Sequence, residues 1–216
     1  NLMFDFINRF NTLDSIAPRL NDLLLGIDWK SRFNASSDKP AEVVSCFQDA
    51  MALNGRFPFN LQVKVLKPLS DRTLYVLIYS TRHPKGVEVF RSAQIKALFA
   101  QAQIRSGTKD RAKEERTGQK DLFGSDTAAE DQVRRFLDEE KSRARDFMFR
   151  ETPISPSSTS FGALAVQTMT NYVVAKADVG AIGAEFKSTG DFLFPTWAAR
   201  KRRPDDEYPV MRRPRA

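Results

Sequence analysis

The chain has 216 residues, and its 34 Lys and Arg outnumber its 27 Asp and Glu to give a formal net charge of +7. Hydrophobic residues make up 41%, enough for one or two domain cores, and no apolar run approaches the roughly 18 residues that cross a bilayer. The single cysteine, Cys46, excludes an internal disulfide and a multi-cysteine zinc site, and without a visible signal peptide we expect a cytoplasmic protein.

The chain opens on an apolar run, residues 1–6, that is typical of a buried strand. The first residues of a domain usually fray unless the rest of the fold holds them. We therefore expect the sequence to be the C-terminal part of a longer protein.

Residues 1–104 have the mixed pattern of an α/β domain. Apolar residues at helical spacing predict a helix over Thr12–Leu25, which Gly26 would end, and another over about Ala41–Leu53. The polar stretch Arg32–Lys39 between them is predicted to be a loop.

A β-hairpin and a long helix complete this block. Apolar patterning predicts strands at Asn60–Lys67 and Thr73–Ser80, and the short turn between them makes the pair antiparallel. The helix is predicted from about Pro84 to Ile104, with Val87 and Phe90 facing inward.

Charge dominates the middle of the chain. Residues 105–127 carry many charges and three glycines, which indicates a linker or a solvated helix end. Residues 128–150 are predicted to form a connecting helix with an apolar side that includes Phe136 and Phe147. Residues 151–160 are rich in Pro and Ser, which is typical of a hinge.

The last block, residues 161–216, is predicted to be compact again. Short helices are expected at Phe161–Asn171 and Lys176–Ser188, followed by strands at Asp191–Trp197 and Tyr208–Arg212. This is the order of an α+β winged helix-turn-helix, although helical pairs with a hairpin also occur without any nucleic-acid role.

The excess positive charge gathers at the C-terminus, where residues 200–216 hold seven basic residues against three acidic ones. In a wing, such cations reach phosphates or the minor groove, and lysines of the preceding helix add to them. An equally weighted interpretation is a solvated loop that Asp205, Asp206 and Glu207 partly neutralise. The candidate nucleic-acid-binding residues are Arg200, Lys201, Arg202, Arg203, Arg212, Arg213, Lys176 and Lys187.

Three aromatic residues in the same region have two interpretations. Phe192, Phe194 and Trp197 could stack on bases. Their alternation along a predicted strand favours packing against the helices instead.

A second candidate site lies where two predicted strands end, because α/β proteins place ligands at the carboxyl ends of their strands. One interpretation is a substrate or phosphate pocket; the other, which we favour, is a set of loop ion pairs and a helix cap. The residues concerned are Asp5, Asn8, Arg9, Arg82, His83 and Lys85.

Neither catalytic residues nor a metal site can be assigned from the residues. No pair of carboxylates has a spacing that argues acid–base catalysis, and a single histidine excludes catalytic triads and zinc sites that need several.

Four segments together resemble the three-Cys-motif partner proteins, a bacterial and phage-associated family. They are Phe4–Phe10, Leu74–Phe90, Arg116–Phe123 and, more weakly, Ala177–Pro204. The resemblance implies that residues 1–104 are the C-terminal part of a Rossmann-like methyltransferase domain that ends in an antiparallel hairpin. It also implies that residues 161–216 are a winged-helix domain.

The same resemblance implies a cofactor and a partner. The full-length protein would bind S-adenosylmethionine, and its neighbour would be a three-cysteine protein of the radical-S-adenosylmethionine type. This sequence lacks the Gly-x-Gly element on which the cofactor would rest, since only Gly180 and Gly183 are near neighbours. We therefore expect no cofactor in this fragment and no methyl transfer by it alone.

Two hypotheses of function follow. In the first, the winged helix brings a methyltransferase-like domain to DNA or RNA. In the second, the chain is a non-catalytic module that docks a protein partner, such as the radical-type enzyme. Neither involves a membrane.

Overall fold

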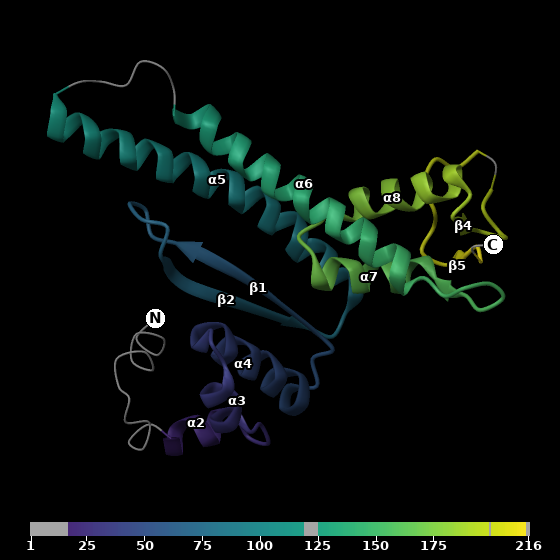
Figure 1. Cartoon of the computed structure of the whole chain (residues 1–216), viewed down its shortest axis with the longest axis horizontal. Helices are drawn as coiled ribbons and strands as arrows, with labels where there is room; N and C mark the ends of the chain where they lie inside the picture. The colour runs from purple at the N-terminus through teal and green to yellow at the C-terminus, as the bar shows by residue number, and fades with distance from the viewer. Residues whose placement is uncertain (1–16, 119–124, 199, 215–216) are drawn as a thin grey trace. The chain divides into compact units, whose positions relative to one another are not determined.

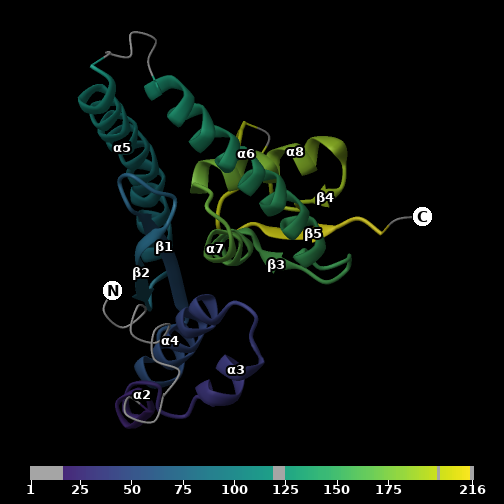
Figure 2. The same cartoon turned by 60° about the vertical axis from the view of Figure 1, so that its left-hand side comes forward.

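The chain divides into two units after His83. The computed structural model describes residues 17–118, 125–198 and 200–214, whose helices and strands are drawn in Figures 1 and 2. Each unit combines helices with one small antiparallel sheet, so the predicted mixture of helix and strand is present. Within these ranges, no helix has the length and apolar content needed to cross a membrane.

Three helices form the core of the N-terminal unit: α2 (Ala17–Leu23), α3 (Trp29–Ala35) and α4 (Lys39–Gly55). After α2, Gly26 has a φ of +80°, the left-handed conformation expected of a residue that ends a helix. The three helices bury a single apolar cluster, which consists of Leu20, Leu24, Trp29, Phe33, Val43, Cys46 and Ala50.

The helix α3 occupies part of the segment that the sequence predicts to be a loop, so the loop Arg32–Lys39 is wrong in its first half. The Asp28 carboxylate accepts a hydrogen bond from the Ser31 backbone N–H at 3.3 Å and caps the helix. Trp29 and Phe33, one turn apart, are both buried in the core cluster. Two large side chains on one face therefore stabilise a helix too short for its periodicity to be recognised.

The Arg32 side chain links α3 to α4 through hydrogen bonds. Its guanidinium donates hydrogen bonds to Glu42 at 2.6 Å, to Asp49 at 2.5 Å and to Ser45 at 2.9 Å. The hydrogen bond to Asp49, followed by the one to Glu42, raises the pKa of Arg32 above its ordinary value.

The strands β1 (Phe59–Leu66) and β2 (Thr73–Thr81) form the predicted antiparallel hairpin. Leu61 pairs with Tyr79 and Val63 with Leu77, so one face of the hairpin is apolar along its length. Leu61 is 1% exposed whereas Leu77 is 51% exposed, so this face is covered only at one end.

Two long helices, α5 (Pro84–Thr117) and α6 (Ser125–Glu151), open the C-terminal unit. They run side by side in both views (Figures 1 and 2). α5 continues past its predicted end at Ile104, which makes residues 105–117 the solvated helix end rather than the linker. Residues 119–124, in the remainder of the predicted linker, lie outside the described residues.

The sheet of this unit has three antiparallel strands: β3 (Thr159–Ser160), β4 (Phe192–Leu193) and β5 (Pro209–Arg212). Their order in the sheet is β3-β5-β4. The predicted hinge 151–160 is tied to β5, because the Ser155 N–H donates to the Arg212 carbonyl at 2.9 Å and the Arg212 N–H donates to Pro153 at 2.7 Å. Part of the segment is therefore held against the sheet, and its last two residues form β3.

α7 (Phe161–Asn171) spans the predicted residues, and α8 (Lys176–Thr189) ends one residue beyond its predicted end. The Ser160 hydroxyl accepts from the Ala163 N–H at 3.2 Å at the start of α7. The two helices approach closely, since a Cβ at Gly183 would lie 2.7 Å from the ring of Phe161.

The two C-terminal strands are shorter than predicted. β4, for example, covers only part of Asp191–Trp197. Aromatic rings fill the space between the sheet and the helices. The centroids of Phe186 and Phe192 lie 4.4 Å apart, and those of Phe194 and Trp197 lie 4.9 Å apart. The first contact holds β4 against α8, and the second lies within the β4–β5 segment.

Candidate nucleic-acid interface

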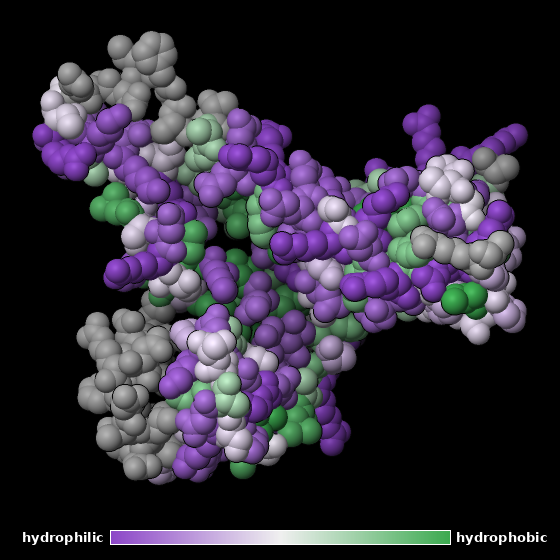
Figure 3. Space-filling model, in the orientation of Figure 1, coloured by the Kyte–Doolittle hydropathy of each residue, from purple (hydrophilic) through white to green (hydrophobic). Residues whose placement is uncertain are grey.

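Basic residues from three places in the sequence border α8. Lys176 and Lys187 lie on the helix itself. Arg203, from the β4–β5 segment, passes over Gly180 with its Cδ 3.2 Å from where a Cβ would stand. Arg213, which follows β5, approaches Gly190 in the same way at 3.7 Å. In Figure 3, long hydrophilic side chains project near the region that Figure 1 labels β4 and α8.

The acidic residues of the β4–β5 segment neutralise part of this charge. Lys201 forms an ion pair with Asp205, and Lys176 forms one with Asp206. The hydrogen bond between the first pair raises the pKa of Lys201 and lowers the pKa of Asp205. Asp206 is also held by its backbone, whose carbonyl accepts from the Gly162 N–H at 2.8 Å at the start of α7. Two of the eight candidate cations are thus engaged by carboxylates within the chain.

Two further candidates are held by aromatic rings. The Lys187 ammonium lies 4.0 Å from the centroid of Trp197, and the Arg212 guanidinium carbon lies 4.8 Å from the centroid of Phe149. The Trp197 indole also donates to the Lys201 carbonyl at 2.8 Å. Trp197 therefore braces the β4–β5 segment in this structure.

Four of the candidate cations are not neutralised by a carboxylate in the part of the chain that is described. Arg200, Arg202, Arg203 and Arg213 are exposed, and none of them forms an ion pair there. These four guanidiniums are the groups best placed to contact phosphate.

The outer surface of α8 carries little that could read a base sequence. Ala177 and Ala181 are exposed, and Ser188 uses its hydroxyl on the Glu185 carbonyl at 2.7 Å. The Glu185 carboxylate accepts from Arg145 of α6 at 2.8 Å. Such a surface suits contact with a backbone better than hydrogen bonding to base edges.

The second candidate site is not assembled among the described residues. Asp5, Asn8 and Arg9 lie outside them. Arg82 donates to the Gly55 carbonyl at 2.7 Å and covers the ring of Phe57. The His83 side chain is exposed, and Lys85 pairs with Glu88 at 2.7 Å. The partners of Arg82 and Lys85 are those of a loop and a helix start.

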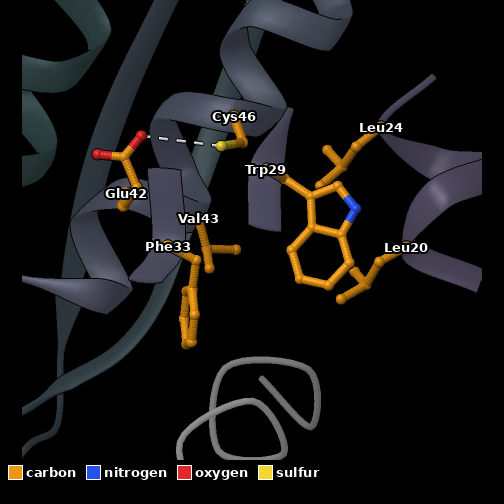
Figure 4. Close-up of a pocket in the computed structure, with 7 residues that line it drawn as sticks. All are labelled: Leu20, Leu24, Trp29, Phe33, Glu42, Val43 and Cys46. Atoms are coloured by element: carbon orange, nitrogen blue, oxygen red, sulfur yellow. Dashed lines mark hydrogen bonds between the residues drawn. The ribbon is translucent and has the colours of Figure 1, made fainter. Parts of the chain in front are cut away.

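The N-terminal unit contains a small hollow beside Cys46 (Figure 4), of about 10 Å³. Its walls are Leu20, Leu24, Trp29, Phe33, Glu42 and Val43, and the Cys46 thiol lies 3.8 Å from a Glu42 oxygen. Because the hollow holds no more than a water molecule, it is a packing defect of the core rather than a ligand site. Among residues 17–118, 125–198 and 200–214, no three His, Cys, Asp or Glu side chains are placed to hold a metal ion.

Sequence reasoning did not identify two buried charged side chains near the end of α7. Arg91 of α5 is 4% exposed and contacts the last turn of α7, and Glu140 of α6 is 8% exposed and contacts Val173 in the segment that joins α7 to α8. In the sequence, these two residues cannot be told apart from other charged residues of a long solvated helix. Only their inward position in the structure distinguishes them. The spacing of Arg91 from the inward-facing Val87, one helical turn away, was the single available signal.

Comparison with known proteins does not assign this chain to a family. No protein-family model, curated protein or solved structure matches it.

Proposed function

We propose that the C-terminal unit is a winged-helix module that binds the phosphate backbone of nucleic acid. The order α6, β3, α7, α8, β4, β5 and the sheet order β3-β5-β4 support this assignment. In such a module α8 takes the place of the recognition helix, and the β4–β5 segment is the wing.

One observation carries the proposal: Arg203 lies against α8 and Arg213 lies against the glycine that ends it, although β5 separates the two arginines in the sequence. The exposed Arg200 and Arg202 belong to the same β4–β5 segment as Arg203. Guanidiniums bind phosphate oxygens through paired hydrogen bonds, and a cluster of them at the edge of a helix creates a positive surface. The small, mostly uncharged outer surface of α8 supports binding that depends little on sequence.

The test measures binding of fluorescently labelled nucleic acid by anisotropy at 50 and 200 mM salt. The probes are a DNA duplex of about 30 base pairs and the RNA duplex of the same sequence, together with a scrambled version of each. The triple variant R200Q/R202Q/R213Q should weaken binding and lower the slope of log K against log salt by about 2 to 3, since each phosphate contact contributes about 0.9 for duplex DNA.

The matched control is K96Q/R111Q/R135Q, which removes the same charge from exposed positions on α5 and α6. The control should bind like the unaltered chain. Equal loss in both triple variants would reduce the effect to overall charge, and binding that is unchanged by salt and by the wing substitutions would overturn the proposal. The two duplexes decide between DNA and RNA.

A second candidate function is docking of a protein partner, and the internal neutralisation of the wing favours it. Lys176 and Lys201 are already paired with carboxylates, and α8 presents Glu185 among its exposed residues. A partner of the radical-S-adenosylmethionine type, as the family resemblance implies, should then co-purify with this chain after nuclease treatment. Co-purification with no binding of either duplex would select this function.

For the N-terminal unit we propose the end of a methyltransferase-like domain. The support is the antiparallel hairpin, in which β2 has apolar residues on both faces: Leu77 on one, Val76 and Ile78 on the other. Strands with two apolar faces are typical of larger, covered sheets. S-adenosylmethionine would belong to the complete domain, since the glycine-rich element is not in this sequence.

A further inference from the structure

We infer that Arg91 of α5 and Glu140 of α6 are positioning residues, which hold the α7–α8 connection and thereby fix α8 for binding. The effect on binding rests on the proposed function, whereas the effect on the connection does not. The inference extends the binding module beyond α7, α8 and the wing to include both long helices.

Arg91 closes the C-terminal end of α7. Its Nε donates to the Met169 carbonyl at 2.6 Å and one terminal nitrogen donates to the Thr170 carbonyl at 2.9 Å. The last four carbonyls of a helix have no partner within it, and these are two of them. A cation at this position is also stabilised by the helix dipole.

The Arg91 side chain is itself held in place. Its other terminal nitrogen donates to the Gln94 side chain, one turn away on α5, at 2.5 Å. Burial lowers the pKa of Arg91 to about 10, and the nearby Glu140 carboxylate acts in the opposite direction. The guanidinium is therefore charged at neutral pH, and its hydrogen bonds offset the cost of taking that charge out of water.

Glu140 holds the connection from the other side. Its carboxylate accepts from the Val173 backbone N–H at 2.8 Å and from Arg143 at 3.3 Å. Val173 lies between α7 and α8, where its N–H has no place in either helix. Removing Glu140 would leave a partly buried N–H without an acceptor, in addition to removing a negative charge that acts on Arg91.

Neighbouring residues of α6 extend the same contact along α8. The Lys141 ammonium lies 3.3 Å from the Asp178 carboxylate at the start of α8. The Arg145 guanidinium forms an ion pair with Glu185, two turns further along α8. The Asp178 carboxylate also accepts from the Ala175 N–H at 3.1 Å. The start of α8 is thus defined by polar contacts to α6, with Arg91 fixing the helix that precedes it.

The test combines hydrogen exchange with the binding assay on the full chain. Variants R91M and E140A should raise the exchange rate of the amides at 170–175 at least about tenfold, and weaken duplex binding by a similar factor. The Val210 amide of β5, a fully buried strand residue, reports global opening and should change much less. R135Q, elsewhere on α6, should change neither rate nor affinity.

Conservative variants separate positioning from general stability. E140Q keeps an oxygen that can accept from the Val173 N–H, so it should restore most of the protection that E140A loses. If R91M does not fold, the comparison of the exchange rates of E140A and E140Q tests the inference. Unchanged exchange at 170–175 in a folded R91M or E140A variant would overturn the inference, as would faster exchange without any loss of affinity.

The two proposals fail in different ways. If the unaltered chain binds neither duplex, the nucleic-acid function is wrong, while the exchange rates still decide whether Arg91 and Glu140 hold the connection.

Discussion

The burial of Cys46 in the core determines the reactivity of its thiol. It is 2% exposed and lies on α4 among the apolar residues of the N-terminal unit. Burial raises the pKa of its thiol, more than the neighbouring Arg32 lowers it. The thiol is therefore the favoured form in the folded chain, and we expect an unreactive cysteine.

The first prediction concerns this thiol. Because its folded pKa is raised, its contribution to stability is complete below the ordinary thiol pKa of about 8.5 and is lost as the pH rises above that value. The free energy of unfolding of the N-terminal unit should therefore fall as the pH rises above about 8.5, and native labelling by a disulfide reagent should lag far behind labelling in urea.

Cys46→Ala is the matched variant. It should have a lower stability at pH 7, since it removes packed atoms, but it should lose this component of the pH dependence. Equal labelling rates for the native and the unfolded chain would contradict the burial of the thiol.

Ion pairing among the C-terminal cations cannot be obtained by counting residues. The sequence states how many basic and acidic residues there are, but not which Lys meets which Asp. Among the described residues Lys201 and Lys176 pair with carboxylates, whereas Arg200 and Arg202 form no ion pair. Within the β4–β5 segment, the neutralised Lys201 therefore lies between two arginines whose charge is not neutralised.

At the scale of a single element, the position at which a helix ends is encoded most directly in the sequence. α8 ends at Gly190, whose φ of +78° belongs to the left-handed region, and a Cβ there would meet only the end of the Arg213 side chain. Gly107, by contrast, lies inside α5 with open space where a Cβ would stand. The two glycines differ in backbone conformation while neither is confined by its neighbours.

The second prediction uses this pair. Gly190→Ala should destabilise the C-terminal unit by about 1 kcal/mol, because an alanine is strained in the left-handed conformation. Gly107→Ala should stabilise it by about 0.5 to 1 kcal/mol, because alanine favours a helix interior. Urea unfolding followed by circular dichroism measures both, and effects of the same sign would contradict the assigned conformations.

Element prediction succeeded where one local pattern was long enough. α7 has the predicted bounds, and both strands of the β1–β2 hairpin and its antiparallel pairing were predicted. It failed for α3 and β3, which have seven and two residues. Neither length establishes a period, and β3 exists only because β5, about fifty residues later, supplies its hydrogen bonds.

At the scale of the whole molecule, the two units have separate cores and one tryptophan each. Trp29 is buried in the N-terminal cluster and donates its indole N–H to Asn21 at 2.9 Å. Trp197 packs against Phe194 in the C-terminal unit. Fluorescence therefore reports each unit by itself once the other tryptophan is replaced.

The third prediction is that the units unfold at different urea concentrations. W197F, which leaves Trp29, should show the lower midpoint, since the hairpin of the N-terminal unit leaves large apolar residues such as Leu77 uncovered. W29F should leave the midpoint reported by Trp197 unchanged. Coincident transitions in both variants would contradict the division into two independently cooperative units.

The sequence by itself determined the helix and strand content, the hairpin, most helix ends and the concentration of basic residues near the C-terminus. Each of these depends on residues within a few positions of one another. Only the tertiary structure decided that part of residues 151–160 joins a sheet, which of the C-terminal cations pair with carboxylates, and that Arg91 closes a helix 78 residues away. The reason is physical: a charged residue on a long helix has the same local pattern whether it faces water or a neighbouring helix end, and only packing distinguishes the two.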